Sequence, residues 1–358
     1  MADRPSATAE PLVEVADLAR WFEVSPPFLD RLIERGSRRW LKAVDGVDFA
    51  IRRGETFSLV GESGCGKSTI ARLVVGLDAP TRGSVRFEGT EIAGRSRDAL
   101  KRIRRRVQMI FQDPYASLNP RWRVRDIIAE PIRAHRLARG TAAIAERVAE
   151  LLRQVKLTPA DGDKYPHEFS GGQRQRISIA RALASAPDFL VCDEPTSALD
   201  VSVQAQILNL MKDLQRDLGL TYLFISHNLA VVYHISDRVG VMYLGRLVEL
   251  TSGEDLFRTP LHPYTRLLIE TIPDMAMSGR RREPVGGEVP SPLDPPAGCA
   301  FHPRCPFAAA RCRREAPALR RHGAGLVACH AVEEGRLPPL AGSRNDDRSA
   351  IPIGGARA

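Results

Sequence analysis

Apolar residues in this chain occur both in short continuous runs and at helical spacing. Residues 43–60 predict a strand, a turn at Gly54 and a second strand over 56–60. A glycine-rich stretch follows, and behind it a helical face is predicted by the spacing of Thr69, Ile70, Leu73 and Val74. The local order is therefore strand, loop, helix.

Further along, two amphipathic stripes predict helices, one over 144–155 and one over 207–214 that Gly219 can end. Short apolar runs at 189–192 and 222–225 predict buried strands. Strands that alternate with helices indicate a parallel α/β sheet. No apolar run approaches the roughly 20 residues of a membrane-spanning helix, so we do not expect an integral membrane protein.

Composition and charge narrow the class of protein. Hydrophobic residues make up 43% of the 358 positions and charged residues 27%, which is typical of a globular protein. Residues 1–15 carry acidic residues and prolines where a secretory signal needs a cationic start, so we expect a cytosolic protein. The net charge of +9 suits contact with nucleic acid or with the inner membrane leaflet. The densest basic run, 101–106, lacks interleaved aromatics, and we interpret it as a solvated face.

The glycine-rich stretch matches the phosphate-binding pattern G-x-x-x-x-G-K-S/T in the strand, loop, helix context that this pattern requires. Its residues are Gly61, Glu62, Ser63, Gly64, Cys65, Gly66, Lys67 and Ser68. In such a loop the backbone N–H groups surround phosphates, and we expect Lys67 to reach the β- and γ-phosphates and Ser68 to ligate Mg²⁺. A glycine turn that happens to precede Lys-Ser is the alternative.

A pair of carboxylates ends one of the apolar runs. We interpret Asp193 as a Mg²⁺ ligand that acts largely through water from the edge of the sheet. Glu194 lies just beyond the strand, where it could orient and polarise water for attack on a γ-phosphate. A solvated strand end is the alternative, and the phosphate loop favours the catalytic role. Each motif occurs once, which indicates one nucleotide-binding unit.

Taken in order, these motifs resemble those of ABC ATPases, over about residues 12–335. The ordered set is Phe169-Ser170-Gly171-Gly172-Gln173, Asp193-Glu194, Ser197-Ala198-Leu199-Asp200 and His227. The resemblance implies an α/β fold, a P-loop NTPase (RecA-like) core with a small antiparallel β part, a helical signature subdomain and a Cys-rich C-terminal extension. It also implies hydrolysis of Mg-ATP between two cassettes, because the signature and the phosphate loop of one chain lie too far apart to grip one nucleotide.

The resemblance assigns roles by position. Gln112 matches the loop that contacts Mg²⁺ and the attacking water and couples to membrane subunits. Asp200 matches the loop that bridges the dimer, and His227 matches the switch residue that bonds the γ-phosphate. The signature expected to close over the opposite subunit's γ-phosphate consists of Ser170, Gly171, Gly172 and Gln173.

The adenine contact and two departures complete the comparison with the family. Phe22 aligns best with the aromatic that stacks on adenine; Trp40 is its rival, and either could be a packed aromatic. Thr69 joins the phosphate loop among the expected ATP contacts. Phe169 replaces the leucine of many relatives, which is a conservative exchange. Asn228 replaces the usual aspartate after the switch histidine, which bears on tuning of the switch rather than on hydrolysis.

Several runs resemble the oligopeptide/dipeptide importer ATPases, in particular their F-type subunit. They are Ala43-Val44-Asp45-Gly46-Val47, Ala116-Ser117-Leu118-Asn119-Pro120-Arg121, Ile127-Ile128-Ala129-Glu130-Pro131, Asp200-Val201-Ser202-Val203-Gln204-Ala205-Gln206, His262-Pro263-Tyr264-Thr265, and Gly298-Cys299 to Cys305-Pro306. The resemblance implies a peripheral protein at the cytoplasmic face of the inner membrane. Its implied partners are two transmembrane permease subunits, an extracytoplasmic substrate-binding protein and a second ATPase, which is either a D-type chain or the same chain. No specific nucleic acid is expected.

The domain prediction follows these motifs. We expect an N-terminal strand and family-specific insert over 1–40, a nucleotide-binding domain over 41–260, a C-terminal importer-type region over 261–340 and a disordered tail over 341–358. The helical subdomain is placed at about 115–185.

The six cysteines fall into two groups. Cys65 and Cys192 lie in the nucleotide site and are interpreted as small space-filling residues. The other four fall close together in a chain expected to be cytosolic, where disulfides are rare, so metal binding is predicted at Cys299, Cys305, Cys312 and Cys329. Four thiolates suit an iron–sulfur cluster, and some members of the importer family carry a 4Fe–4S cluster in this region. Zinc and unliganded thiols are the alternatives.

Three other functions compete with peptide import. Nickel and glutathione importers share the importer pattern, so the sequence does not identify the cargo. A soluble ABC ATPase that acts on nucleic acid would suit the basic charge, but the long coiled-coil insertion or second cassette of such proteins is missing from this sequence. An exporter cassette is often fused to membrane helices that the sequence also lacks.

Overall fold

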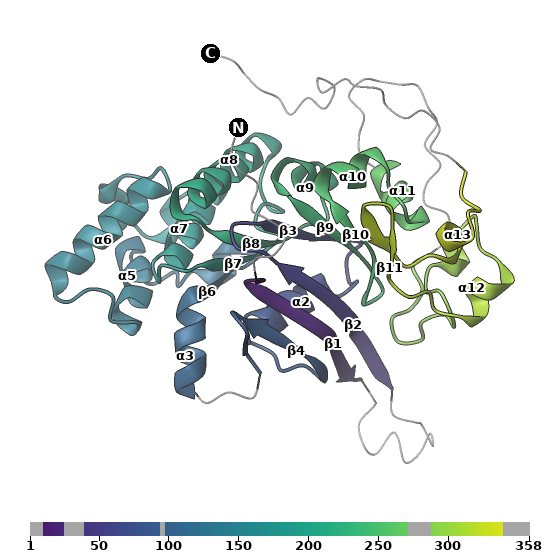
Figure 1. Ribbon diagram of the computed structural model, residues 1–358. Helices are drawn as coiled ribbons and strands as arrows, with labels where there is room; N and C mark the ends of the chain where they lie inside the picture. The colour runs from purple at the N-terminus through teal and green to yellow at the C-terminus, as the bar shows by residue number, and fades with distance from the viewer. Residues whose placement is uncertain (1–9, 25–38, 94–96, 271–287, 339–358) are drawn as a thin grey trace, which may run out of the picture.

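The computed structural model describes residues 10–24, 39–93, 97–270 and 288–338. Part of the predicted insert within residues 1–40, and the whole predicted tail after 340, lie outside the described residues. The described elements form two sheets with helices around them (Figure 1).

The larger sheet has eight strands in the order β11-β12-β10-β9-β3-β8-β7-β6. Their bounds are β3 Thr56–Val60, β6 Val107–Ile110, β7 Phe189–Asp193, β8 Thr221–Ile225, β9 Arg238–Tyr243, β10 Arg246–Ser252, β11 Arg320–His322 and β12 Gly325–Val327. The strands from β9 to β6 are parallel, and β10, β12 and β11 join them by antiparallel pairing. Every residue of β3, β7 and β8 is buried, as expected for parallel strands that are covered on both faces.

The smaller sheet is antiparallel, with the order β2-β1-β4-β5. Its strands are β1 Val13–Glu23, β2 Trp40–Ile51, β4 Arg82–Phe87 and β5 Thr90–Glu91. Helix α2, Lys67–Val74, shares one core with both sheets: Ile70 packs in a cluster that includes Val47 from β2 and Leu223 from β8. The predicted strand, turn, strand and helix over 43–74 are therefore confirmed, with the turn at Gly54.

Helices cover the other face of the larger sheet. Tyr222 and Phe224 of β8 point into this second core, whereas the alternating Leu223 and Ile225 belong to the first, because side chains of a strand alternate between its faces. Helix α8, Val201–Leu218, packs here and ends at Gly219 in the left-handed conformation, as predicted. The remaining helices on the nucleotide-binding part are α3 Arg97–Arg106, α4 Pro114–Ser117, α5 Val124–Ala134, α6 Thr141–Gln154, α7 Gly171–Leu183, α9 Leu229–Ile235, α10 Gly253–Arg258 and the short η1 Pro159–Asp163 and η2 Pro166–Glu168.

Figure 1 shows α5, α6 and α7 together at one end of the molecule. They are held to each other and to the large sheet by a continuous core that contains Ile128, Leu152 and Ile177. None of the described helices combines the length and the apolar character needed to span a bilayer.

The C-terminal elements lie at the opposite end in Figure 1. They are α11 Pro263–Glu270, η3 His302–Arg304, α12 Ala310–Arg314, the β11–β12 hairpin and α13 His330–Glu333. Phe301 packs edge-on against Tyr243 of β9, with ring centroids 5.3 Å apart, and lies 5.5 Å from Tyr264 of α11. This aromatic cluster joins the C-terminal region to the edge of the parallel sheet.

A buried acid anchors the start of the C-terminal region to β10. Glu249 is fully buried, and its carboxylate accepts hydrogen bonds from the N–H groups of Leu261 (2.9 Å) and His262 (2.8 Å). The His262 ring is also buried, and its Nδ1 accepts from the N–H of Tyr264 at 3.0 Å. Burial lowers the pKa of His262 from 6.5 to about 3, so the folded ring stays neutral.

Because the folded pKa of His262 lies below the unfolded one, the stabilising effect is present above pH 6.5 and is lost as pH falls. At pH 5.5 the ring binds a proton in the unfolded state but not in the folded state. This protonation stabilises the unfolded state and lowers the free energy of unfolding by about 1.4 kcal/mol. When pH falls from 7.5 to 5.5, we therefore expect the free energy of unfolding to drop by about 1.4 kcal/mol more in the wild type than in His262→Asn. Urea unfolding at the two pH values measures this difference. Equal pH dependence in the two proteins would contradict the neutral buried ring.

Candidate functional site

The loop between β3 and α2 is shaped by glycines that no other residue could replace. Gly61 and Gly66 have φ of 151° and 105°. A Cβ on Gly61 would lie 2.3 Å from the carbonyl oxygen of Met242, and one on Gly66 would lie 2.1 Å from that of Ala43. The backbones of β2 and β9 therefore press directly on the loop and fix its path.

Lys67, at the start of α2, folds back over this loop. Its side chain is buried, and Nζ donates to the carbonyl oxygens of Gly61 at 2.7 Å and Glu62 at 3.0 Å. Nζ also lies 3.7 Å from the sulfur of Cys65. A buried ammonium whose partners are all neutral is a strong attractor for an anion. The same turn presents unpaired backbone N–H groups at a helix start, which favour phosphate.

Ser68 connects the loop to the end of β7. Its hydroxyl donates to Oδ1 of Asp193 at 3.0 Å. Burial raises the pKa of Asp193, and the Ser68 hydrogen bond opposes this shift. A hydroxyl and a carboxylate beside the Gln112 amide are oxygen donors of the kind that Mg²⁺ prefers, so the residues fit this cation.

Glu194 follows β7 and contacts residues at the ends of the neighbouring strands β6 and β8. It has a left-handed φ of 47°, and its N–H donates to the carbonyl of Ile225 at 3.0 Å. Its Oε2 accepts from Nε2 of Gln112 at 3.2 Å and lies 2.9 Å from Nδ1 of His227. The strained turn after β7 thus aims one carboxylate at polar groups that follow β6 and β8.

A cavity of about 790 Å³ opens in front of these groups. Its lining includes Phe22 but not Trp40, whose side chain is exposed. Of the sequence-predicted residues, the cavity brings together Phe22, Ser63, Gly64, Gly66, Lys67, Ser68, Thr69, Gln112, Glu194 and His227. Gly61, Glu62, Cys65 and Asp193 do not line the cavity, and Asp193 is connected to it through its hydrogen bond with Ser68.

The signature residues do not line this cavity. Ser170 is the exposed N-cap of α7, and its hydroxyl and the Gln173 side chain bond each other's backbone N–H groups at 3.4 and 3.0 Å. Gly172 is buried against α8, where a Cβ would lie 2.4 Å from Val203. Asp200, the N-cap of α8, is also exposed. Ser170 and Asp200 therefore lie at the surface rather than at the pocket of their own chain.

The cavity also contains residues that sequence reasoning missed, namely Leu41, Ala43, Asp113, Ser197 and Ala198. All except Leu41 lie inside or beside a motif recognised in the sequence. Their position in these motifs could therefore have identified them. Arg304 binds the side chain of Glu62 at 2.8 and 3.0 Å. It also lies inside a recognised run, residues 298–306, but the interpretation of that run considered only its cysteines.

The prediction of a 4Fe–4S cluster on Cys299, Cys305, Cys312 and Cys329 is wrong. The part of the chain that the structure describes includes all four, and it holds no group of three or more His, Cys, Asp or Glu side chains that could bind a metal ion, zinc included. Burial raises the pKa of Cys299 to about 12 and of Cys305 to about 11, so these thiols are neutral at pH 7. Cys299 and Cys305 pack near Phe301, and Cys329 packs with Val332.

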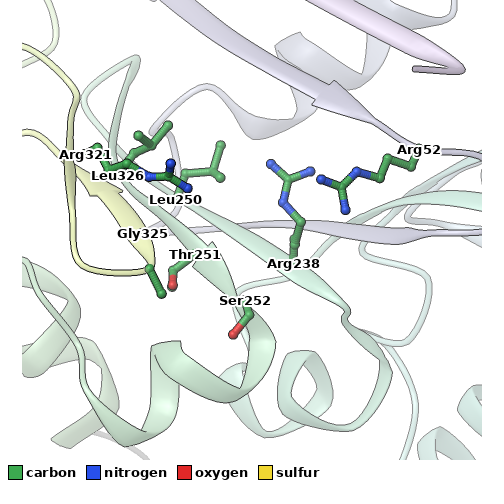
Figure 2. A pocket seen from close by; sticks show the side chains of 9 residues that line it. Arg52, Arg238, Leu250, Thr251, Ser252, Arg321, Gly325 and Leu326 are labelled. Atoms are coloured by element: carbon green, nitrogen blue, oxygen red, sulfur yellow. The ribbon is translucent and has the colours of Figure 1, made fainter. Parts of the chain in front are cut away.

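A second cavity, of about 460 Å³, lies between β10 and the β11–β12 hairpin. Figure 2 shows Arg52, Arg238 and Arg321 around it. Arg238 is paired with Glu55 at 3.1 Å. None of the predicted site residues lines this cavity.

Comparison with known proteins agrees with the geometry of the site. Residues 44–197 match the family described as ABC transporter, and residues 248–312 match the family described as oligopeptide/dipeptide transporter, C-terminal region. The chain therefore contains an ABC cassette, an ATP-hydrolysing module.

Individual relatives cover nearly the whole chain. The putative oligopeptide transport ATP-binding protein YkfD of Bacillus subtilis is 53% identical over 89% of this chain and 95% of its own length. The oligopeptide transport ATP-binding protein OppF of Escherichia coli is 47% identical over 90% and 96%. A solved dimeric ATP-binding cassette in a post-hydrolysis state, bound to ADP and Pi, aligns with a TM-score of 0.59 and 27% identity over 67% of this chain and 98% of that one.

The chain belongs to the oligopeptide/dipeptide ABC transporter family, as an ATP-binding subunit of an importer. The sequence-based recognition of this family is confirmed. The alternatives of a nucleic-acid ATPase, an exporter cassette, and a nickel or glutathione importer are not favoured by these relatives.

The loop geometry predicts that Gly66→Ala weakens Mg-ATP binding by at least about 10-fold. A left-handed φ alone costs a non-glycine residue about 1–2 kcal/mol, and the added Cβ overlaps the Ala43 carbonyl. Gly219→Ala is the matched control, because its φ is 65° and nothing lies within 4 Å of the added Cβ. Isothermal titration calorimetry measures the two affinities for Mg-ATP. Equal affinity in both variants would contradict the claim that the Ala43 carbonyl requires a glycine at position 66.

Proposed function

We propose that the chain binds Mg-ATP in the 790 Å³ cavity and that the signature of a second cassette completes the site. The observation that carries this proposal is that Lys67 lines the cavity whereas Ser170 and Gly172 do not. A γ-phosphate held by Lys67 would therefore face the surface that the partner covers. The solved cassette to which this chain is similar is described as dimeric and bound to ADP and Pi, which supports such a pairing.

Each group of the cavity has a proposed task in binding. Phe22 stacks on adenine, the N–H groups of the loop and of the α2 start surround the phosphates, and Lys67 neutralises their charge. Ser68 and Gln112 would hold Mg²⁺, and Asp193 would act on it largely through water. When bound, Mg²⁺ neutralises charge on the phosphate oxygens.

For hydrolysis, we assign proton transfer to Glu194. Its carboxylate accepts a proton from the water that attacks the γ-phosphate. Gln112 orients this water, and His227 donates a hydrogen bond to the γ-phosphate. Gln112 and His227 both bond Oε2 of Glu194, so the three proposed catalytic side chains already lie within hydrogen-bond reach of one another.

The dimer supplies the link to transport. Asp200 and the signature bridge the two cassettes while a γ-phosphate is present, and its loss after hydrolysis removes the charge that holds them together. Closing and reopening of the pair would drive two permease subunits at the cytoplasmic face of the membrane. The second cassette is either a homologous chain or a second copy of this one.

The proposed cargo is a peptide that an external binding protein delivers. This assignment is supported by the names of the relatives, which are oligopeptide transport proteins, and by the match of residues 248–312.

Glu194→Gln is expected to bind Mg-ATP with wild-type affinity, to lose at least about 100-fold in turnover and to form a stable dimer in ATP. The amide keeps the shape of the side chain but cannot take a proton from water. Glu150→Gln, an exposed change on α6, is the control. Light scattering with and without ATP, together with phosphate release, tests this. Full-rate hydrolysis by a chain that stays monomeric would refute the two-cassette site.

Reconstitution tests the cargo. With its permease and ATPase partners in lipid vesicles, peptide-loaded binding protein should stimulate ATP hydrolysis several-fold, because cargo delivery favours closure of the cassettes. Nickel and glutathione, supplied to the same complex, should leave the rate at its basal level. Stimulation by either of them but not by peptides would contradict peptide import.

A further inference from the structure

The second residue of the phosphate loop is tied to the C-terminal region. Arg304, in η3, donates through Nη1 to Oε2 of Glu62 at 2.8 Å and through Nη2 to Oε1 at 3.0 Å. The two residues are 242 positions apart. This forked pairing of a guanidinium with a carboxylate fixes direction as well as distance.

Arg304 lies in the aromatic cluster that joins the C-terminal region to the sheet. Only 3% of its side chain is exposed, and its guanidinium lies 5.8 Å from the ring centre of Tyr243 and 6.0 Å from that of Phe301. Its Nε has no hydrogen-bond partner. Glu62 is the one carboxylate paired with it among the described residues, and a buried guanidinium without a counter-charge is costly.

The carboxylate, the backbone N–H and the backbone carbonyl of Glu62 each form a hydrogen bond. Its carboxylate binds Arg304, its N–H donates to the hydroxyl of Tyr264 at 2.9 Å, and its carbonyl accepts from Nζ of Lys67 at 3.0 Å. Tyr264 belongs to α11, so two C-terminal elements grip one residue of the loop. Lys67, the expected phosphate-binding ammonium, is the next group in this chain of contacts.

We propose that Arg304, with Tyr264, is a positioning residue for the phosphate loop, so that the C-terminal region sets the affinity of the cassette for Mg-ATP. The inference rests on the proposed function, that the loop binds Mg-ATP. Arg304 acts through Glu62 and does not touch nucleotide. Its removal leaves a carboxylate free to turn toward the phosphates and loosens the carbonyl that orients Lys67.

The attachment of the C-terminal region does not depend on this ion pair alone. Residues Glu249 and Leu250 pair with β12, and the Glu249 carboxylate holds the chain at Leu261 and His262. The region therefore stays docked when Arg304 is replaced, and a change in nucleotide affinity can be separated from a change in folding.

The test compares full-length Arg304→Met and Arg304→Lys with Arg311→Met. Arg311 is the matched control. It belongs to the same region but, among the described residues, its ion pairs are with Glu315, Glu333 and Glu334. The Kd for Mg-ATP, by calorimetry, should rise about 10-fold in Arg304→Met and by less in Arg304→Lys, which keeps the charge without the fork. KM should rise in parallel while kcat changes less than about twofold, since ground state and transition state lose the same support.

A double variant separates the effect of the freed Glu62 carboxylate on nucleotide affinity from a general loss of stability. Glu62→Gln with Arg304→Met removes both charges together, so it should bind Mg-ATP better than Arg304→Met alone if a freed Glu62 carboxylate is the cause. Wild-type Kd and KM in Arg304→Met, with or without a lower melting temperature, would overturn the inference and leave the proposed function intact. Failure of the wild-type chain to bind Mg-ATP would overturn both.

Discussion

The register of the parallel strands controls the whole site. Leu59 of β3 and Asp193 of β7 both lie opposite Ile225 of β8, so the three strands end at the same level. The phosphate loop, the carboxylate pair and the switch histidine are therefore delivered to one edge, although they are far apart in the sequence. A slip of β7 by one residue would turn the carboxylate of Asp193 to the other face of the sheet.

Local sequence patterns predicted most of the residues at this edge of the sheet, because the functional residues at each strand end are consecutive in the sequence. The loop from Gly61 to Ser68, the run that ends at Asp193 and the helix that ends at Gly219 all lie where periodicity and turn residues placed them. The sequence did not show why Gly66 must be glycine. That reason is the carbonyl of Ala43, which belongs to another strand.

The errors and omissions concern contacts between distant segments. The crowding of Cys299, Cys305, Cys312 and Cys329 in the sequence suggested a ligand set, but spacing does not fix where thiols point. In the part of the C-terminal region that the structure describes, Cys312 and Cys329 are buried and Cys299 and Cys305 are half-buried, and they form no metal-binding group. The pairing of Arg304 with Glu62 was missed for the converse reason: neither residue is unusual in its own segment. Only the packing of η3 against β9 brings them together.

The C-terminal hairpin also changes the outer border of the large sheet. Without it, β10 would be the last strand. Five of its seven residues are buried and three of these are apolar, so this ribbon would present apolar side chains and unpaired backbone groups to other molecules. The hairpin replaces this ribbon with β11, three exposed residues that are all basic or imidazole-bearing. Short, charged borders resist the addition of foreign strands. The C-terminal region thus has a second structural role besides its contact with Glu62: it gives the large sheet a border that disfavours edge-to-edge pairing with other molecules.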